Sequence, residues 1–354
     1  MLFTSDNWAG VHPQVFAAMA EANTGSEPAY GADPFTQGAT AALSDLFERE
    51  VFVTYVTTGS AANGLALASL MPPWGAVIAH EHGHVHIDEC GAPEFYTGGG
   101  KVLTVPDEGR GDGKLTPQGV RAALSVYDPP AYHRVRPAVL SLTQATEWGQ
   151  VYDAGEVAAL CEVARGFDLK VHMDGARFAN AVASGAGSPA DLTWRAGVDI
   201  LCLGGTKNGC MAAEAVICFG ETGRDQLPWR QKRAGLSWSK HRFLGAQWTG
   251  YLADGLWLEL AERANAAAAA VASALSRHSA IQLIRKPTIN EVFATMPDET
   301  AEALREQGAR FYDWVQPNDA YERKARRFVT SYVTSEKDID DLRRALEAAS
   351  STDA

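Results

Sequence analysis

Short apolar runs alternate with longer segments of helical periodicity from residue 52 to residue 219 of this 354-residue chain. Such alternation is typical of a mostly parallel sheet whose crossover connections are helices that cover it. The predicted strands are Phe52–Thr57, Ala76–Ala79, Val102–Val105, Ala138–Thr143, Lys170–Asp174, Ile200–Gly204 and Ala215–Cys218. The predicted helices are Ala61–Leu70, Pro117–Ser125 and Gly155–Gly166. The sequence therefore predicts an α/β fold with a mostly parallel central sheet covered by helices.

The pattern changes after Arg242, where a long alanine-rich stretch, Trp257–Leu275, predicts a helix. Shorter strand and helix patterns follow it, at Ile281–Ile284, Glu291–Thr295, Glu299–Gln307, Arg327–Val333 and Glu336–Ala349. These shorter elements predict a small α+β domain beside the sheet domain. We expect an N-terminal segment at residues 1–20, a large domain at 21–242 and a small C-terminal domain at 243–354.

The composition of the chain argues against nucleic-acid and membrane partners and indicates a cytoplasmic protein. The formal net charge is −12, with acidic residues scattered along the chain, whereas nucleic-acid binding needs a basic face. The first residues carry no basic and apolar leader pattern, and no stretch approaches the ~20 apolar residues of a membrane span. The five cysteines form no CxxC pair, which is typical of reduced, buried thiols. We expect a cytoplasmic protein that binds neither nucleic acid nor membrane.

A carboxylate and a lysine follow two predicted strands. The strand that begins at Lys170 ends in Asp174-Gly175-Ala176-Arg177, and the strand Ile200–Gly204 leads into a glycine-rich turn that contains Lys207. Taken singly, Asp174 is explained as a helix cap, Arg177 as its surface partner and Lys207 as a solvated lysine. Because the carboxyl ends of parallel strands meet at one edge of the sheet, the three charges together favour a ligand site.

The segment Gly59-Ser60-Ala61-Ala62-Asn63 follows a predicted strand and opens a predicted helix. Backbone N–H groups and the Ser60 hydroxyl at such a helix start favour an anion, so the segment predicts a phosphate site. The simpler interpretation is that Ser60 is an N-cap residue. Neither this segment nor the turn around Lys207 matches a nucleotide-binding glycine motif.

The segment His80-Glu81-His82-Gly83-His84 spells HExxH, so a zinc hydrolase has to be considered. That motif requires a helix, whereas here it follows a strand, contains Gly83 and continues an alternating pattern through Val85 and Ile87. An extended segment would place His82, His84 and His86 on one face, but no further ligand set follows. We expect no catalytic metal and keep a zinc hydrolase as a minor alternative.

Nearly the whole chain resembles the threonine aldolases and related β-eliminating lyases of the aspartate-aminotransferase fold. It is most similar to the branch of low-specificity L-threonine aldolases and phenylserine aldolases. The matching stretches are Ser5-Asp6-Asn7, Tyr30-Gly31-Ala32-Asp33-Pro34, Gly59–Asn63, His84–Ala92, Ser141–Tyr152, His172–Arg177, Gly204–Gly209, Lys240–Phe243 and Arg327–Ser331.

This resemblance implies a pyridoxal 5′-phosphate cofactor and assigns residues to it. Lys207 matches the lysine that holds the cofactor as a Schiff base, and Asp174 matches the partner of the pyridine nitrogen. His84 matches the ring that stacks on the cofactor. Gly59 and Ser60 match a phosphate-binding Gly-Thr pair, with serine in place of the usual threonine.

The resemblance also implies how the substrate is held. Arg177 matches a ligand of the cofactor's ring hydroxyl and of the substrate carboxylate, and Ser5 and Arg327 would hold the same carboxylate. Tyr30 matches a tyrosine that reaches the site from a neighbouring subunit. A homotetramer built from dimers with shared active sites is implied.

Two departures from the family pattern concern substrate preference. Ala32 stands where many relatives carry an aspartate, and Glu147 stands where one branch carries an active-site histidine. Glu147 is a candidate for the group that takes a proton from the substrate hydroxyl, with His84 or through water. The expected reaction is retro-aldol cleavage of L-β-hydroxy-α-amino acids to glycine and an aldehyde. The alternatives are β-elimination from another amino acid and a noncatalytic protein that binds pyridoxal phosphate.

Overall fold

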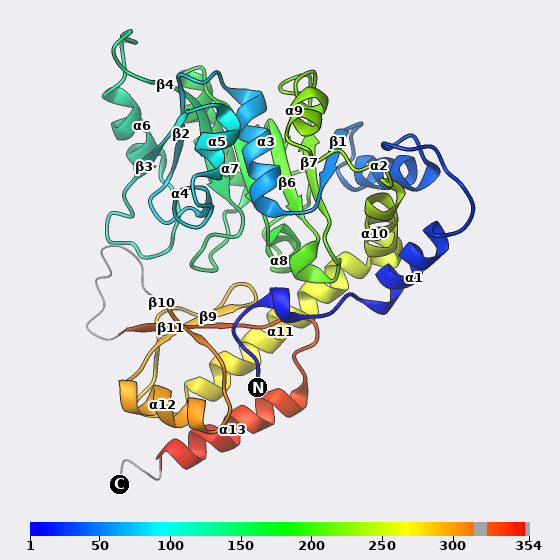
Figure 1. Cartoon of the computed structure of the whole chain (residues 1–354). Helices are drawn as coiled ribbons and strands as arrows, with labels where there is room; N and C mark the ends of the chain where they lie inside the picture. Colours follow the sequence, from blue (N-terminus) through cyan, green and yellow to red (C-terminus); the bar gives the residue numbers. More distant parts are fainter. Residues whose placement is uncertain (315–323, 351–354) are drawn as a thin grey trace.

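The computed structural model describes residues 1–314 and 324–350, which form two lobes with separate sheets (Figure 1). The large lobe holds a seven-stranded sheet in the order β1-β7-β6-β5-β4-β2-β3. Its strands are β1 (Phe52–Val56), β2 (Gly75–His80), β3 (Lys101–Val105), β4 (Arg136–Thr143), β5 (Lys170–Gly175), β6 (Ile200–Gly204) and β7 (Glu214–Cys218). β7 runs antiparallel to both of its neighbours, β1 and β6, and all other pairs of strands in this sheet are parallel. The predicted α/β class with a mostly parallel sheet is confirmed.

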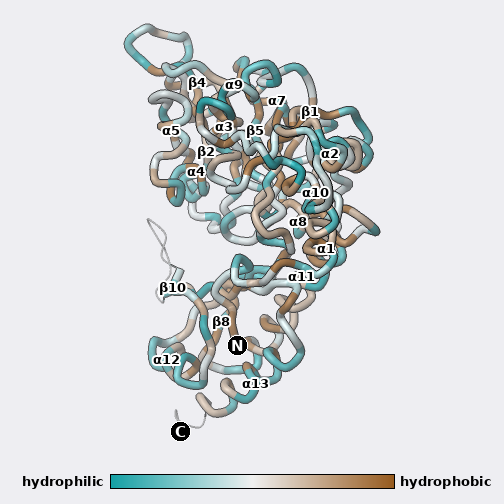
Figure 2. Tube along the Cα trace, turned by 45° about the vertical axis from the view of Figure 1, so that its right-hand side comes forward, coloured by the Kyte–Doolittle hydropathy of each residue, from teal (hydrophilic) through white to brown (hydrophobic). Residues whose placement is uncertain are grey.

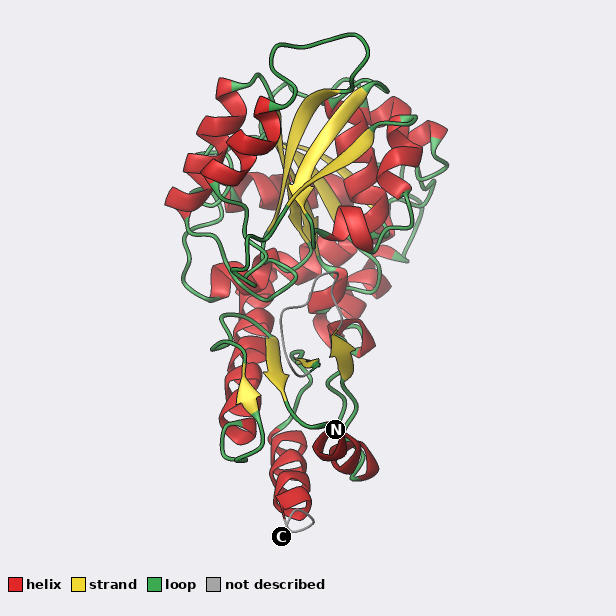
Figure 3. Cartoon of the chain, turned by 90° about the vertical axis from the view of Figure 1, so that its left-hand side faces the viewer, coloured by secondary structure: helices red, strands yellow, loops and turns green. Residues whose placement is uncertain are grey.

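Helices cover both faces of the large sheet, as the side view in Figure 3 shows. Every residue of β2, β6 and β7 is buried, because strands covered on both faces carry apolar side chains on both. One face is covered by α3 (Gly59–Leu70), α5 (Ala92–Thr97) and α9 (Leu227–Arg233). The other face is covered by α2 (Pro34–Leu46), α7 (Ala154–Gly166), α8 (Phe178–Ala183) and α10 (Arg242–Leu252).

Short elements at the rim of the large lobe connect these layers. They are η1 (Asp6–Trp8), α1 (Pro13–Ala22), α4 (His84–Ile87), α6 (Pro117–Ser125), η2 (Thr206–Asn208) and η3 (Ala253–Gly255). Two of them, η1 and η2, lie against each other although the sequence separates them widely. This contact brings the N-terminal segment to the edge of the sheet where β6 ends.

The small lobe is a four-stranded antiparallel sheet in the order β10-β11-β9-β8 packed on helices. Its elements are β8 (Gln282–Leu283), β9 (Glu291–Thr295), α12 (Asp298–Glu306), β10 (Tyr312–Trp314), β11 (Ala325–Val329) and α13 (Glu336–Ser350). The long helix α11 (Leu256–Leu275) runs from one lobe into the other (Figure 2). Leu260 lies in the core of the large lobe and Val271 in the core of the small one.

The N-terminal residues belong to the small lobe. The Phe3 N–H donates to the Arg310 carbonyl at 2.8 Å, and the Val329 N–H donates to the Phe3 carbonyl at 2.8 Å. The Phe3 side chain is fully buried in the core of this lobe. The chain then leaves the small lobe and passes the edge of the large sheet as η1.

The predicted elements correspond to observed ones with shifts of a few residues at their ends. The largest shift is at the predicted strand Arg327–Val333, because β11 begins at Ala325 and ends at Val329. The prediction that all cysteines are buried is wrong for Cys90, which is exposed. The domain boundaries at residues 20 and 242 stay a prediction. Within the described residues, no helix is long and apolar enough to cross a membrane.

Candidate active site

A cavity of about 290 Å³ opens where β4, β5 and β6 end. Ligands of open α/β sheets bind at this edge, outside the carboxyl ends of the strands. The cavity is lined by Asn7, Thr57, Thr58, Gly59, Ser60, Asn63, His84, Thr143, Ala145, Glu147, Asp174, Ala176, Arg177, Thr206, Lys207 and Glu214. The predicted carboxylate, lysine and anion-binding segment thus share one cavity.

Asp174 is buried near the end of β5, where it pairs with Thr143 of β4 and Cys202 of β6. Its Oδ2 accepts a hydrogen bond from Asn63 Nδ2 at 2.8 Å, and its Oδ1 accepts one from the Ala176 N–H at 3.0 Å. Burial alone would raise the pKa of Asp174, but nearby positive charge, that of His84 foremost, and the hydrogen bond from Asn63 lower it overall. A buried carboxylate is thereby kept ionised.

Lys207 lies in η2, which directly follows β6. Two glycines before it allow a close approach of the backbone, since a Cβ on Gly204 would lie 2.8 Å from the Ala176 carbonyl oxygen and one on Gly205 2.8 Å from that of Ala213. The neighbouring Glu214 at the start of β7 also lines the cavity, and burial raises its pKa to about 7. The tight turn fixes the backbone of Lys207 at the cavity wall.

The N-terminus of α3 lies at the same cavity, which Thr58, Gly59 and Ser60 line. Thr58 is the N-cap, because its side chain accepts a hydrogen bond from the Ala61 N–H at 3.3 Å. The simpler interpretation of Ser60 as the N-cap is therefore wrong, and Ser60 lines the cavity instead. A Cβ on Gly59 would meet nothing within 4 Å, so the space in front of the first turn is open. This arrangement suits an anion.

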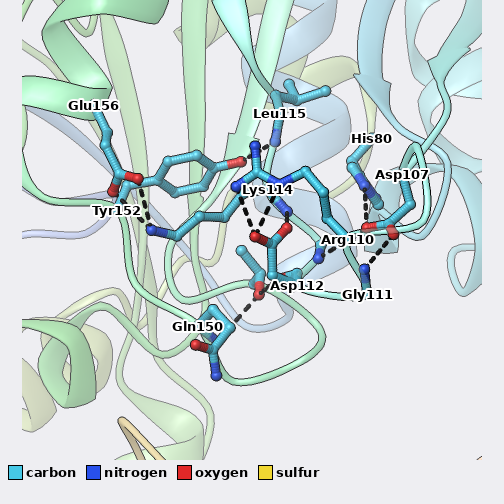
Figure 4. Close-up of polar contacts among 12 residues, drawn as sticks. His80, Asp107, Arg110, Gly111, Asp112, Lys114, Leu115, Gln150, Tyr152 and Glu156 are labelled. Carbon is cyan, nitrogen blue, oxygen red and sulfur yellow. Dashed lines mark hydrogen bonds and ion pairs between the residues drawn. The ribbon is translucent and has the colours of Figure 1, made fainter. Parts of the chain in front are cut away.

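The HExxH segment does not form a zinc-binding helix. His80 is the last residue of β2 and His84 is the first residue of α4, so the two rings do not share a helix face. His80 Nε2 lies 3.3 Å from Asp107 Oδ1, beside the loop shown in Figure 4. The extended conformation predicted for residues 82–87 is also wrong, because the carbonyl of Gly83 accepts hydrogen bonds from the N–H groups of residues 86 and 87 and starts α4.

His84 and Glu147 meet at the cavity wall. Glu147 Oε1 accepts a hydrogen bond from the His84 backbone N–H at 2.6 Å, while its buried Oε2 has no hydrogen-bond partner among the described residues. Burial raises the pKa of Glu147 to about 7. Burial would lower the pKa of His84, but its hydrogen bond to Glu89 and the charge of Asp174 raise it overall. Two groups whose pKa values are raised therefore face one cavity.

Two arginines and two carboxylates form a cluster beside the cavity. Arg177 Nε donates to Asp6 Oδ2 at 2.8 Å, and Arg177 Nη1 lies 3.4 Å from Glu291 Oε1. Arg327 Nη1 lies 3.8 Å from the same Glu291 oxygen, and its guanidinium stacks 4.1 Å from the Trp314 ring centroid. The cluster joins η1, the large lobe and the small lobe.

Seven of the predicted site residues line the cavity: Gly59, Ser60, His84, Glu147, Asp174, Arg177 and Lys207. Three do not. Ser5 caps η1 by accepting from the Asn7 N–H at 3.2 Å, and Arg327 reaches Arg177 only through Glu291. Tyr30 is exposed, with Lys232 Nζ 4.8 Å from its ring centroid.

Sequence reasoning did not assign roles to five residues that the structure places at the site. They are Asp6, Asn63, Glu89, Glu214 and Glu291. Three of them, Asp6, Asn63 and Glu89, lie inside the stretches that match the family. Glu291 had one available signal, which is a charged residue at the start of a strand that is otherwise apolar.

A lysine, a buried carboxylate and a helix N-terminus that converge at the carboxyl edge of a mostly parallel sheet define an α/β enzyme. A family model described as "Beta-eliminating lyase" matches residues 3–299. The chain is 42% identical over 350 residues to a low specificity L-threonine aldolase of Pseudomonas sp., covering 99% of this chain and 98% of that protein. It is also 42% identical over 343 residues to a low specificity L-threonine aldolase of Pseudomonas aeruginosa, covering 97% of this chain and 96% of that one.

The fold of a solved structure agrees with this relationship. The structure of Leishmania major threonine aldolase superimposes with a TM-score of 0.89 and 28% sequence identity, covering 100% of this chain and 99% of that one. The chain belongs to the β-eliminating lyase family.

Proposed function

We propose that this protein binds pyridoxal 5′-phosphate and cleaves L-β-hydroxy-α-amino acids into glycine and an aldehyde. The observation that carries the proposal is the convergence of Asp174, Lys207, His84 and the N-terminus of α3 on one cavity. The relatives named low specificity L-threonine aldolase support the same reaction.

The residues of the cavity fit this cofactor. Its phosphate suits the open first turn of α3 at Gly59 and Ser60, its ring nitrogen suits the ionised Asp174 carboxylate, and its aldehyde suits the Lys207 amine. The His84 side chain is about one-third exposed and would cover the face of the ring. When bound, the cofactor supplies an electron sink for the electron pair left on Cα when a bond to Cα breaks.

The side chains around the cavity select which bond breaks. The groups that hold the substrate carboxylate would fix which bond to Cα is oriented for cleavage, so they determine the reaction. We assign this task to Arg177, Arg327 and Ser5. Arg177 is already anchored by Asp6, which fixes the direction of its guanidinium group.

Glu147 is assigned the proton of the β-hydroxyl group. In its ionised form, its Oε2 accepts that proton while the Cα–Cβ bond breaks, the hydroxyl oxygen becomes the aldehyde oxygen, and the electron pair stays on Cα. A proton that returns to Cα completes glycine. We further propose a homo-oligomer with shared active sites in the cytoplasm, in which the exposed Tyr30 reaches the cavity of a neighbouring subunit.

The products test this function. We expect purified protein with pyridoxal phosphate to release glycine and aldehyde in equal amounts from threonine, allo-threonine or phenylserine, measured by amino-acid analysis and an aldehyde-reduction assay. Glycine with an aldehyde should drive the reverse synthesis. Pyruvate and ammonia from an amino acid with a β-leaving group, with no glycine from the three hydroxy amino acids, would instead identify an eliminating lyase. No turnover of any of them would favour a noncatalytic binding protein.

Glu147→Gln tests the base. Because Glu147 must be ionised to accept a proton and its pKa is about 7, turnover of the unsubstituted enzyme should rise with pH through this value. In Glu147→Gln the rising limb should disappear and turnover should fall by about a hundredfold. Glu162→Gln, on the exposed side of α7, serves as the control and should keep the profile of the unsubstituted enzyme. An unchanged profile in Glu147→Gln would assign the proton to another group.

A further inference from the structure

Glu89 is a buried carboxylate that the proposed reaction does not use. It lies between α4 and α5, and its side chain has no exposed surface. The next two residues, Cys90 and Gly91, have left-handed backbone conformations with φ values of 51° and 75°. This sharp turn directs Glu89 inward, toward α3 and β5.

One oxygen of Glu89 receives two hydrogen bonds. His84 Nδ1 and Asn63 Nδ2 both lie 2.8 Å from Glu89 Oε1. Because an ionised carboxylate only accepts, the hydrogen of His84 is placed on Nδ1. The atom of the ring that is left to gain or lose a proton is Nε2.

Asn63 extends this contact to Asp174. Its amide nitrogen carries two hydrogens, and its second 2.8 Å contact is to Asp174 Oδ2. The orientation of the amide is fixed, because the reverse orientation would place its oxygen against two carboxylates. A continuous hydrogen-bonded chain therefore runs from His84 through Glu89 and Asn63 to Asp174.

Stability alone does not explain this arrangement. Glu89 Oε2 and Asn63 Oδ1 are buried and have no hydrogen-bond partner among the described residues. A buried carboxylate with one unpaired oxygen costs free energy, whereas an apolar side chain at this position would not. A role at the site is the simpler explanation.

We propose that Glu89 is a positioning residue that, together with Asn63, fixes the orientation and the protonated nitrogen of His84 and couples this ring to Asp174. The inference rests on the proposed function only for the task of His84 at the cofactor. Four charged or titratable groups face the ring: Glu89, Asp174, Lys207 and Glu147. Among these four groups, Glu89 is the one that contacts a ring nitrogen, 2.8 Å from His84 Nδ1.

The test measures His84 directly, because a pH profile of turnover would also report Glu147, whose pKa is about 7. Ring nitrogens of histidine-labelled full-length protein are followed by NMR against pH, with and without pyridoxal phosphate, and the His84 signal is identified by its loss in His84→Gln. In Glu89→Gln the pKa of His84 should fall by about one unit or more, because an opposite charge is lost. Glu89→Asp keeps the charge and should restore most of the shift. Glu94→Gln, in α5, is the matched control and should change nothing.

Activity provides a second readout. In Glu89→Gln, kcat for threonine should fall about tenfold with little change in KM, because Glu89 acts through His84 and touches no residue assigned to the substrate carboxylate. An unchanged His84 titration in Glu89→Gln, or an equal shift in Glu94→Gln, would overturn the proposal. If Glu89→Gln does not fold, a His84 pKa in Glu89→Asp that is no higher than that of an ordinary histidine does the same, because this variant keeps the charge.

Metal binding is a rival explanation for the side chains that surround His84, and it can be tested on the same purified protein. Donor atoms of His84, Glu89 and Asp174 lie within 4.8 Å of one another, which is a spacing that a metal ion can use. Stoichiometric zinc in the purified protein that perturbs the His84 signal would overturn the positioning role. A protein that binds no pyridoxal phosphate would refute the proposed function, while the NMR titration would still decide the role of Glu89.

Discussion

Replacement of Lys207 by alanine is expected to abolish turnover. The amine at this position is the group assigned to the cofactor aldehyde. Among the described residues that line the cavity, no other is a lysine. Removal of a covalent catalytic group typically costs more than about a thousandfold in rate. The fold should remain, because the side chain is only partly buried and the glycine turn that carries it is unchanged. Circular dichroism and thermal unfolding check this point.

The attachment site gives a measurement that does not depend on activity. Borohydride treatment of the loaded protein should fix the cofactor to the peptide that contains Lys207, as read by mass spectrometry, and Lys207→Ala should show no fixed cofactor. Lys101→Ala, on the edge strand β3, is the control and should retain both the label and the turnover. A label on Lys232 or Lys240 would show that the lysine assignment is wrong.

Asp174→Asn is expected to suppress cleavage and synthesis together. The substitution keeps the size of the side chain but removes the negative charge that would keep the ring nitrogen of the cofactor protonated, so the electron sink is weakened in both directions. Loss of one partner of a buried charge pair costs roughly 3 kcal/mol or more, which corresponds to a rate loss of about a hundredfold. Initial rates with threonine, and with glycine plus acetaldehyde, should fall by similar factors.

A matched control separates this effect from instability. Asp199 accepts a hydrogen bond from the Val171 N–H at 2.8 Å and precedes β6. It therefore lies at the amino ends of the parallel strands, whereas Asp174 lies at their carboxyl ends. Asp199→Asn should lower the midpoint of thermal unfolding yet leave turnover per folded molecule unchanged. If Asp174→Asn loses no more activity than this control, the carboxylate has no part in the chemistry.

The strand ends that carry the cavity were predictable because their pattern is local. A buried apolar run that ends in glycine and charged residues is typical of the end of a parallel strand, and this pattern located both Asp174 and Lys207. The direction of each strand was not predictable in the same way. The apolar run of β7 is compatible with a parallel or an antiparallel strand, and the structure shows it antiparallel to β6. The helix α4 was missed because four residues are too few to show helical periodicity.

The cluster around Arg177 was beyond sequence reasoning for a different reason. Its members come from η1, the start of α8, β9 and β11. No local pattern relates a glutamate that begins a strand to an arginine more than one hundred residues earlier. The prediction that Arg177 binds the substrate carboxylate did not include the contacts that this side chain makes with Asp6 and Glu291. Charge pairs of this kind are fixed by tertiary structure alone.

The N-terminal segment, which joins the small lobe and then passes the cavity, makes the arginine cluster depend on both ends of the chain. Asn290 donates to Asp6 across 284 residues, and the Tyr332 hydroxyl donates to the Gly10 carbonyl across 322 residues. Contacts between such distant segments close loops that span most of the chain. Asp6 therefore lies beside Arg177 only when the N-terminal segment, the small lobe and the large lobe are all in place. The anion-binding end of α3 belongs to the large lobe alone, whereas the arginine cluster beside the cavity is a property of the whole chain.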